Sequence, residues 1–223
     1  MRSRADLSAL ALATIGAVTI LVVLGLASRP RGGDALPTSP PAALSTPTQA
    51  AAASPSYAAA APAPAIELTS SDGSRFSLAS RRGVPQLVFF GYTHCPDVCP
   101  TTMGEMQGWF SALGDEAKTL KGVFITVDPA RDTPEILDGY VSWVSDHLVA
   151  LTGSQSEIDK VVKDWNVTAE KVPGEGDDYT MNHTASVFLV DSKGQFVGTI
   201  GYGENTDTAL EKIRRLIANN PSA

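Results

Sequence analysis

FGYTHCPDVCP, residues 90–100, contains the only two cysteines of this 223-residue chain, Cys95 and Cys99. The continuous apolar run Leu87–Phe90 leads into this stretch and is typical of a strand covered on both faces. Apolar side chains recur at helical spacing after it, namely Met103, Met106, Phe110 and Leu113. We therefore expect both thiols to lie in one turn between a buried strand and a helix, a position that suits chemistry at sulfur.

A proline follows each cysteine, and the two prolines predict the shape of the turn. Because proline disfavours helical geometry in the preceding residue, Cys95 is expected to be extended or in a turn. Cys99 fits a helix N-cap, with Pro100 as the first helical residue. The free N–H groups and partial positive charge of a helix N-terminus would favour thiolate at Cys99. We expect the turn to bring the sulfurs close enough to share a metal ion or to form a disulfide.

Three interpretations of the cysteine pair remain open. A structural disulfide would close so short a loop that it would remove little chain entropy. A thiol–disulfide oxidoreductase usually has two residues between its cysteines, whereas this turn has three. A metal site fits two soft thiolates, which select Cu(I) or Zn(II), but it requires a third donor.

Candidates for the third donor are the histidines and a methionine. His94 adjoins Cys95 and points the other way in an extended chain, so it is expected to support the site or pack in the core. His147 is expected at the surface or at a helix C-terminus. Met103 falls on an apolar helical stripe, which favours packing. His183 follows an acidic, glycine-containing loop and precedes an expected strand, and the residues alone leave its role open.

Strands and helices alternate along the rest of residues 66–223. We expect hairpins around Asp72-Gly73 and around 191–194, and a loop at 173–178. A buried strand is expected at Val123–Val127 and a short strand at Val149–Thr152. Helices are expected to begin near Asp132 and Ser154, and a last helix carries Leu210, Ile213 and Ile217. The second helix stripe would run through Leu137, Val141, Val144 and Leu148. This order predicts an α/β fold, a mixed sheet with helices on both faces, which fits a thioredoxin-like fold with an added N-terminal β-hairpin.

The N-terminal 65 residues differ in composition from the remainder. Leu7–Ser28 carries no charge and could span roughly 30 Å as a helix, so residues 1–28 are predicted to be an uncleaved transmembrane anchor. Cleavage after Ala27 is the alternative. Residues 29–65 are rich in Ala and Pro and are expected to be a disordered linker. We expect the N-terminus in the cytoplasm and the 66–223 domain on the exported side.

The charge of the domain argues against nucleic acid as a partner. The first 65 residues hold four of the 17 basic and two of the 24 acidic side chains, so residues 66–223 keep 13 basic and 22 acidic groups, a formal charge of −9. Nucleic-acid binding usually needs the opposite sign. An acidic surface is compatible with cations or with a basic protein surface.

Three segments carry a resemblance to a known family. GYTHCPDVCP at 91–100, TVDPARDTPE at 126–135 and NHTA at 182–185 resemble the signature segments of the Sco/SenC copper-chaperone family and occur in the same order. The likeness spans nearly all of 66–223, and a membrane anchor also fits it. Three separate motifs are much more specific than an isolated pair of cysteines.

The resemblance implies that one copper ion binds through Cys95, Cys99 and His183. Cu(I) is the expected state, and Cu(II) is a second candidate because imidazole suits it. It also implies assembly of the dinuclear copper centre in cytochrome c oxidase subunit II, without enzymatic turnover, at an inner membrane with the domain on the periplasmic side or its intermembrane-space equivalent. Other copper chaperones or thiol reductases are further expected partners.

The resemblance also concerns Asp128, and two expectations from the residues themselves stand beside it. Asp128 would lie near the site, where it could tune the metal, contact a partner or only cap N–H groups at a strand end. His94 is given a supporting or partner-contact role. The alternative function is a membrane-tethered thiol–disulfide reductase in which Cys95 and Cys99 cycle through a disulfide and keep the target's copper-site cysteines reduced.

Overall fold

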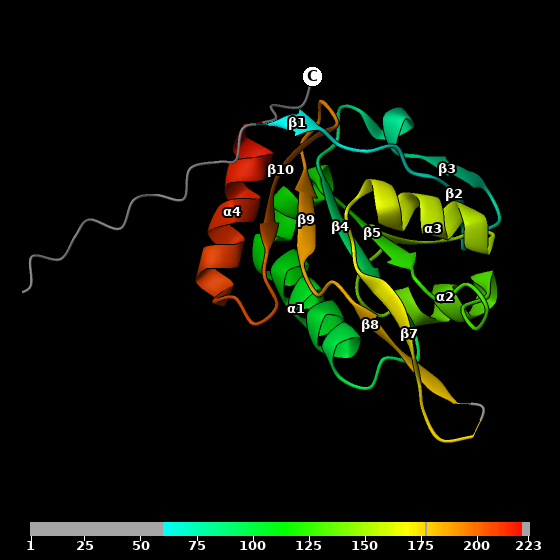
Figure 1. The fold of residues 1–223 in the computed structure, drawn as a ribbon. Helices are drawn as coiled ribbons and strands as arrows, with labels where there is room; N and C mark the ends of the chain where they lie inside the picture. Colours follow the sequence, from blue (N-terminus) through cyan, green and yellow to red (C-terminus); the bar gives the residue numbers. More distant parts are fainter. Residues whose placement is uncertain (1–59, 177, 220–223) are drawn as a thin grey trace, which may run out of the picture. The chain divides into compact units, whose positions relative to one another are not determined.

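Three neighbouring parallel strands form the centre of the fold: β4 (Gln86–Gly91), β5 (Lys121–Thr126) and β6 (Leu148–Thr152). The computed structural model describes residues 60–176 and 178–219 of the chain (Figure 1). Every residue of β4 is buried, as its apolar run predicts. The strand leading into the cysteine turn is thus held rigidly inside the core.

Antiparallel strands extend this centre on both sides. They are β1 (Ala61–Pro62), β2 (Glu67–Ser70), β3 (Arg75–Ser77), β9 (Val187–Val190) and β10 (Gln195–Ile200). Within the described residues the order is β1-β10-β9-β4-β5-β6-β2-β3. The predicted N-terminal hairpin is confirmed as β2–β3, with Gly73 at φ 82° in the turn. Because β1 pairs with β10, the folded chain begins before Ile66, where the sequence places its start.

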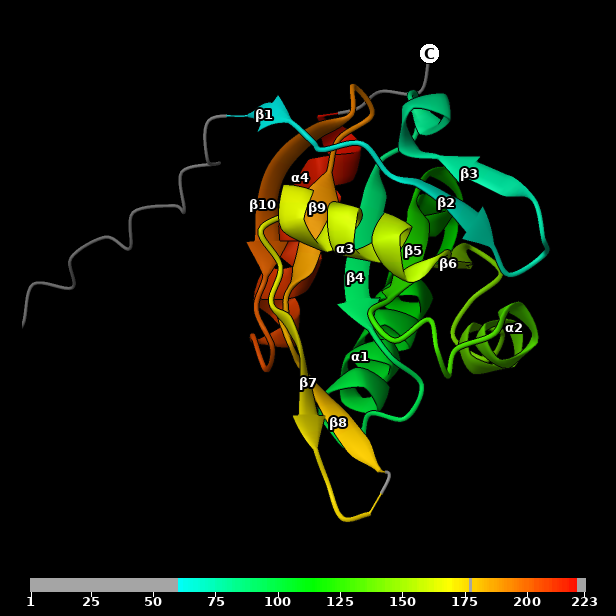
Figure 2. The ribbon, with the colours of Figure 1, turned by 45° about the vertical axis from the view of Figure 1, so that its right-hand side comes forward.

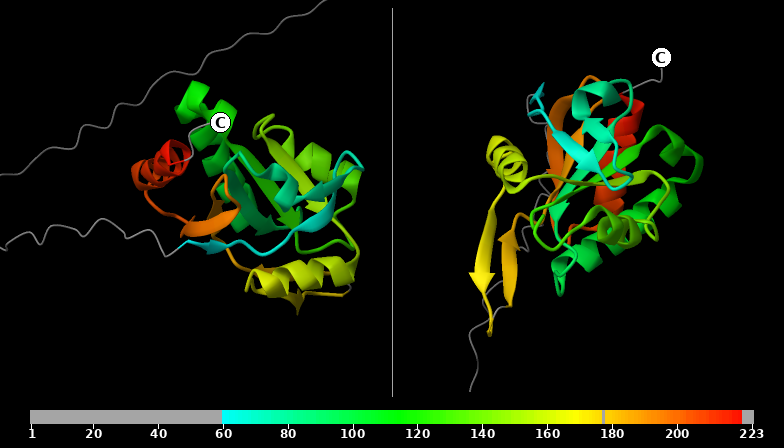
Figure 3. Two further views of the ribbon diagram at one scale, coloured as in Figure 1. Left: turned by 90° about the horizontal axis from the view of Figure 1, so that it is seen from above. Right: turned by 90° about the vertical axis from the view of Figure 1, so that its right-hand side faces the viewer.

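Four α-helices cover the sheet in the described residues. They are α1 (Val98–Leu113), α2 (Pro134–Val141), α3 (Gln155–Asp164) and α4 (Thr206–Ala218). Short 3-10 segments at Leu78–Arg81 and Gly114–Thr119 precede β4 and β5. Figure 3 shows α1 and α4 over one face of the sheet and α3 over the other. The expected mixed α/β architecture with helices on both faces is confirmed.

Helix α2 is shorter than its apolar spacing predicts. It ends at Val141, while Val144 is buried in a turn and Leu148 begins β6. The Ser145 hydroxyl accepts a hydrogen bond from the His147 amide at 3.1 Å. Such a local side-chain bond offers the backbone an alternative to helix and favours a turn at this point.

A second, two-stranded sheet was missed by the sequence analysis. It is the hairpin of β7 (Ala169–Pro173) and β8 (Tyr179–His183), which extends away from the main sheet (Figure 2). The strand expected after His183 is present as β9, but His183 is itself the last residue of β8. Residues 179, 181 and 183 are half-buried while 180 and 182 are exposed, the period-two pattern of a strand with one covered face. A lone two-stranded hairpin is marginally stable, so this one depends on contacts with the rest of the domain.

The predicted membrane anchor, residues 1–28, and residues 29–59 of the predicted linker lie outside the described part of the chain. Among residues 60–176 and 178–219, no helix has the length and apolar character needed to cross a bilayer.

The contacts at the start of α3 predict that the stability of the fold decreases in acid. Ser154 and Glu157 form the expected capping box, and Arg75 Nη1 lies 2.9 Å from Glu157 Oε1. Hydrogen bonds from the Ser154 amide and hydroxyl, together with Arg75, lower the pKa of Glu157 to about 2. A carboxylate with a depressed folded pKa stabilises the fold above its unfolded value near 4.5 and loses that contribution as pH falls toward 2.

Glu157→Gln is therefore expected to have a lower melting temperature than wild type near neutral pH. The difference in melting temperature between the two proteins is expected to shrink as the pH falls from about 4.5 to 2. Thermal melts across this range, with Glu175→Gln in the exposed hairpin turn as a control for charge loss, would test this. Parallel melting curves for wild type and Glu157→Gln at every pH would contradict it.

Candidate metal centre

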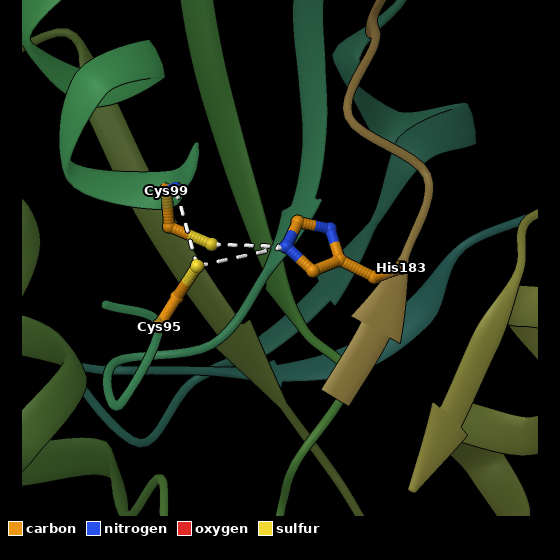
Figure 4. A group of neighbouring side chains, drawn as sticks. All are labelled: Cys95, Cys99 and His183. Atoms are coloured by element: carbon orange, nitrogen blue, oxygen red, sulfur yellow. Dashed lines mark hydrogen bonds between the residues drawn. The ribbon is translucent and has the colours of Figure 1, made fainter. Parts of the chain in front are cut away.

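Cys95, Cys99 and His183 come together from two distant parts of the chain (Figure 4). His183 Nε2 lies 3.2 Å from Cys99 Sγ and 3.9 Å from Cys95 Sγ. All three donor atoms lie within 4.8 Å of one another. Bonds from a metal to sulfur or imidazole nitrogen are about 2.0–2.3 Å long, so donors on one ion can lie up to about 4.6 Å apart. The two thiols and the imidazole therefore converge on a space that suits a single ion.

The strand-to-helix turn positions the sulfurs. The helix starts at Val98 with Asp97 at the N-cap, two residues earlier than the sequence predicts, so Cys99 lies inside the first helical turn. The Cys99 amide, one of the free N–H groups of that turn, donates to Cys95 Sγ at 3.3 Å. The helix N-terminus thus directs its amide at Cys95 rather than at the Cys99 sulfur.

Burial separates the two thiols chemically. Cys99 is buried and Cys95 is half-buried, and both are free thiols. Burial, with the nearby Cys95 sulfur adding to it, raises the pKa of the Cys99 thiol far above its usual range. The prediction of a thiolate at Cys99 in the metal-free protein is therefore wrong. A metal ion that binds there must displace the proton.

The imidazole of His183 is prepared to act as a neutral ligand. Its Nδ1 lies 3.1 Å from the Thr184 carbonyl oxygen and donates to it, which leaves Nε2 with a free lone pair toward the sulfurs. Burial lowers the pKa of His183, so the ring stays neutral near pH 7. The rings of Tyr92 and Phe89 contact it edge-on, with centroids 5.7 and 6.1 Å away. These contacts fix both the tautomer and the ring orientation.

A cavity of about 250 Å³ opens beside the donor atoms. It is lined by Tyr92, residues 95–98 and residues 180–183. Cys95 and His183 border this cavity and are half-buried, whereas Cys99 lies behind them in the core. An incoming donor group can therefore reach Cys95 and His183 first.

A buried carboxylate that the sequence analysis did not single out supports the turn. Asp132 has no exposed surface and accepts hydrogen bonds from the Thr93 amide at 3.1 Å and from the Thr93 and Thr126 hydroxyls at 2.6 and 2.5 Å. Thr93 lies two residues before Cys95. Asp132 therefore ties the exit of β4 to the loop after β5. The sequence places Asp132 at a helix start, a position where an exposed cap is the ordinary expectation.

The supporting residues named from the sequence have different surroundings. The side chain of His94 is half exposed, so it does not pack in the core; its Nδ1 lies 3.0 Å from Thr93 Oγ1 and 3.9 Å from Asp132 Oδ1. Asp128 is only 4% exposed, and its carboxylate is engaged by Arg131 and Tyr179, which leaves little surface for a partner. The partner-contact role therefore suits His94 better than Asp128.

The other candidate donors lie in packed surroundings. Met103 and Met106 are buried in the core, as their helical spacing predicts. His147 stacks on Phe110, and its Nδ1 lies 3.0 Å from Lys121 Nζ. Across residues 60–176 and 178–219, the Cys95, Cys99 and His183 group is the one set of three His, Cys or acidic side chains with metal-binding spacing.

Gly91 makes room for the buried sulfur. A Cβ atom at this position would lie 2.9 Å from Cys99 Sγ and 3.0 Å from the Phe124 ring. Gly91→Ala is therefore expected to displace the sulfur, to cost about 1–3 kcal/mol of stability and to weaken copper binding.

Gly108→Ala is a matched control for Gly91→Ala, because an added Cβ in this part of α1 meets nothing within 4 Å. It is expected to keep copper affinity and to raise stability by up to about 1 kcal/mol. Denaturant unfolding and copper competition titrations compare the two variants. Equal copper affinity for Gly91→Ala and Gly108→Ala would show that the Cys99 sulfur is not confined as described.

The chain matches proteins of known family. The family model described as SCO1/SenC matches residues 56–218. The mitochondrial protein SCO2 of Saccharomyces cerevisiae is 32% identical over 155 residues, which cover 68% of this chain and 52% of the yeast protein. The chain thus spans about half the length of this relative.

Solved structures share the fold and cover most of their own length. A structure of Bradyrhizobium japonicum ScoI with copper bound is 40% identical, with a TM-score of 0.65 over 70% of this chain and 99% of that one. A protein called BsSco is 26% identical, with a TM-score of 0.56 over 70% of this chain and 94% of that one. Its structure is described as identifying a disulfide switch in a member of the Sco family of cytochrome c oxidase assembly proteins. This chain thus shares its thioredoxin-like architecture with solved Sco proteins, one of which has copper bound.

Proposed function

This chain belongs to the SCO1/SenC family, and we propose that it is a membrane-anchored copper metallochaperone. It would bind one copper ion through Cys95, Cys99 and His183 and deliver it to the dinuclear copper centre of cytochrome c oxidase subunit II. The domain would lie on the periplasmic side of an inner membrane, or in the equivalent intermembrane space. Copper would be cargo, and the protein would not be an enzyme.

The observation that carries this proposal is the convergence of two soft sulfurs and one neutral imidazole. Thiolates select Cu(I), and imidazole also suits Cu(II). The copper-bound ScoI structure supports the choice of copper over zinc. Three donors leave a soft ion open to a further ligand, which is what a delivery protein needs.

Transfer would proceed by ligand exchange. A thiolate or imidazole of the acceptor enters the cavity beside Cys95 and His183 and bonds to the ion. His183, carried on the projecting hairpin, leaves first, and the two sulfurs follow. The buried Cys99 takes back a proton as the ion departs, which its raised pKa favours.

The test is copper transfer to the metal-free soluble domain of subunit II. The reduced protein, loaded with one Cu(I) under anaerobic conditions, is mixed with that domain, and the acceptor's dinuclear centre is followed by its visible absorption after oxidation. The expected result is loss of copper from this protein and its appearance in the acceptor. If copper stays on the loaded protein while the acceptor takes up free Cu(I), the proposal fails.

The free, unequal thiols favour a second candidate function, the thiol–disulfide reductase. Cys95, the more exposed thiol, would attack a disulfide of the target and release one target thiolate, and Cys99 would then displace the other. The target gains two electrons and two protons, and Cys95 and Cys99 become a disulfide that an external thiol must reduce. The disulfide switch named for BsSco supports this possibility. This reaction does not need His183.

A further inference from the structure

The β7–β8 hairpin is fastened to the domain by a cluster that the metal site does not use. We call Asp128, Arg131 and Tyr179 the hairpin latch. Asp128 and Arg131 lie in the loop between β5 and α2, and Tyr179 is the first residue of β8. Because the hairpin lies outside the main sheet, these contacts replace the strand pairing that would otherwise hold it.

The latch is dense and mostly charged. The Tyr179 hydroxyl donates to Asp128 Oδ1 at 2.8 Å, and Arg131 Nε donates to Asp128 Oδ2 at 2.5 Å. Arg131 Nη1 donates to the Tyr179 carbonyl oxygen at 3.1 Å, and the guanidinium carbon lies 3.6 Å from the centre of the Tyr179 ring. Lys171 Nζ also lies 3.6 Å from that centre. Hydrogen bonds to charged groups and cations over an aromatic ring are among the stronger polar contacts in proteins.

The latch is coupled to the copper ligand in two ways. Tyr179 and His183 share the covered face of β8, about 13 Å apart along the strand. The Arg131 guanidinium also lies 5.8 Å from the centre of the Tyr92 ring, and Tyr92 contacts His183. Fixing Tyr179 therefore fixes the strand that carries the imidazole and the ring against which the imidazole packs.

At the base of the hairpin its two strands are joined to each other, close to where the chain connects them to α3 and β9. The Thr184 amide donates to the Thr168 carbonyl oxygen at 3.1 Å, and the Thr168 amide donates to Thr184 Oγ1 at 2.9 Å. His183 thus lies between the base of the hairpin, where the chain continues into β9, and the latched end. Arg131 Nη2 is buried without a hydrogen-bond partner, so closing the latch carries a desolvation cost that opening recovers. The polar contacts of the latch hold the hairpin in place, and the desolvation cost at Arg131 offsets part of their stabilisation, so the latch can also open.

From these contacts we propose that the hairpin latch positions His183 over the two sulfurs and thereby sets how fast copper leaves. Asp128, Arg131 and Tyr179 are positioning residues in this scheme, because none of them belongs to the donor group. With the latch closed, the imidazole stays on the ion; with it open, the hairpin swings about its base at Thr168 and Thr184 and the imidazole detaches. The inference rests on the proposed function, since it assigns a role in copper release from the same site.

Tyr179→Phe tests the latch, because it keeps the ring between the cations and removes only the hydroxyl that binds Asp128. Cu(I) release from the full-length protein to an excess of a Cu(I) chelator is expected to be about three- to tenfold faster. The nitrogen hyperfine coupling in the electron paramagnetic resonance spectrum of the Cu(II) form is expected to weaken, which a merely stabilising role would not cause. Tyr202→Phe, at a tyrosine that is 45% exposed, is the matched control and should match wild type.

Asp128→Asn is the second variant and should also release copper faster. If Asp128→Asn does not fold, the result for Tyr179→Phe alone decides whether the latch controls copper release. Unchanged release and an unchanged Cu(II) spectrum in folded Tyr179→Phe would overturn the latch and leave the chaperone function standing. Failure of the wild-type protein to bind copper at all would instead overturn the proposed function.

Discussion

Cys99→Ala is expected to abolish tight copper binding, with the affinity for Cu(I) falling by more than about 100-fold. Loss of residues that merely support a ligand costs about 10–100-fold, and Cys99 would supply one of only two soft sulfurs. Alanine suits this buried position, because a free cysteine in the core behaves as a small apolar side chain. Metal content after dialysis against a Cu(I) competitor measures the effect.

Cys95→Ala separates the roles of the two thiols. It should also lose copper, but with a smaller change in stability, since Cys95 is half-buried. A thermal melt of each variant excludes unfolding as the cause. One tightly held copper per Cys99→Ala molecule would contradict the assignment of the buried sulfur as a ligand.

His183→Ala is expected to lower copper affinity by at least about 10-fold, the smallest cost of losing even a residue that supports a ligand, and to leave a two-sulfur site. The imidazole Nε2 lies 3.2 Å from Cys99 Sγ, and no other His, Cys or acidic side chain of the described residues joins this group. The rate at which Cys95 and Cys99 exchange with a small disulfide should stay near that of wild type. The variant thus separates the chaperone from the reductase, because only the chaperone needs the imidazole.

His147→Ala is the matched control for the histidine substitution. His147 stacks on Phe110 beside Lys121 and belongs to a different surface. It should retain wild-type copper binding. Equal copper retention by His183→Ala and His147→Ala would show that the site has two ligands from this chain and not three.

The central strands and helices could be predicted because their apolar patterns are strong. The runs in β4 and β5 are buried on both faces, and the α1 stripe of Met103 and Met106 packs in the core. Helix ends were less predictable. Val144 and Leu148 continue the apolar spacing of α2 beyond its last residue, because Val144 is buried and Leu148 is partly buried against the core.

The β7–β8 hairpin was not predicted, because its sequence has no apolar run. Glu170 and Lys171 are exposed, and the covered face consists of Tyr179, Met181 and His183. Their alternation with polar residues was the available signal. Its contacts come from Asp128 and Arg131, about 50 residues earlier, and no local pattern encodes such a distant pairing.

Only part of the metal site could be predicted from the residues themselves. The cysteine pair in one turn pointed to sulfur chemistry, whereas the choice of His183 came from the family resemblance. The state of Cys99 was predicted wrongly because helix position was weighed without burial. Desolvation of a thiolate depends on what covers it, and that is decided by tertiary packing around Gly91 and Phe124.

X-ray absorption spectroscopy at the copper edge, on the reduced protein loaded anaerobically with Cu(I), tests most directly whether two sulfurs and one imidazole bind the same ion. We predict one copper per chain with two sulfur and one imidazole nitrogen neighbours, and loss of the nitrogen in His183→Ala. A spectrum with sulfur neighbours alone, unchanged in His183→Ala, would contradict the account.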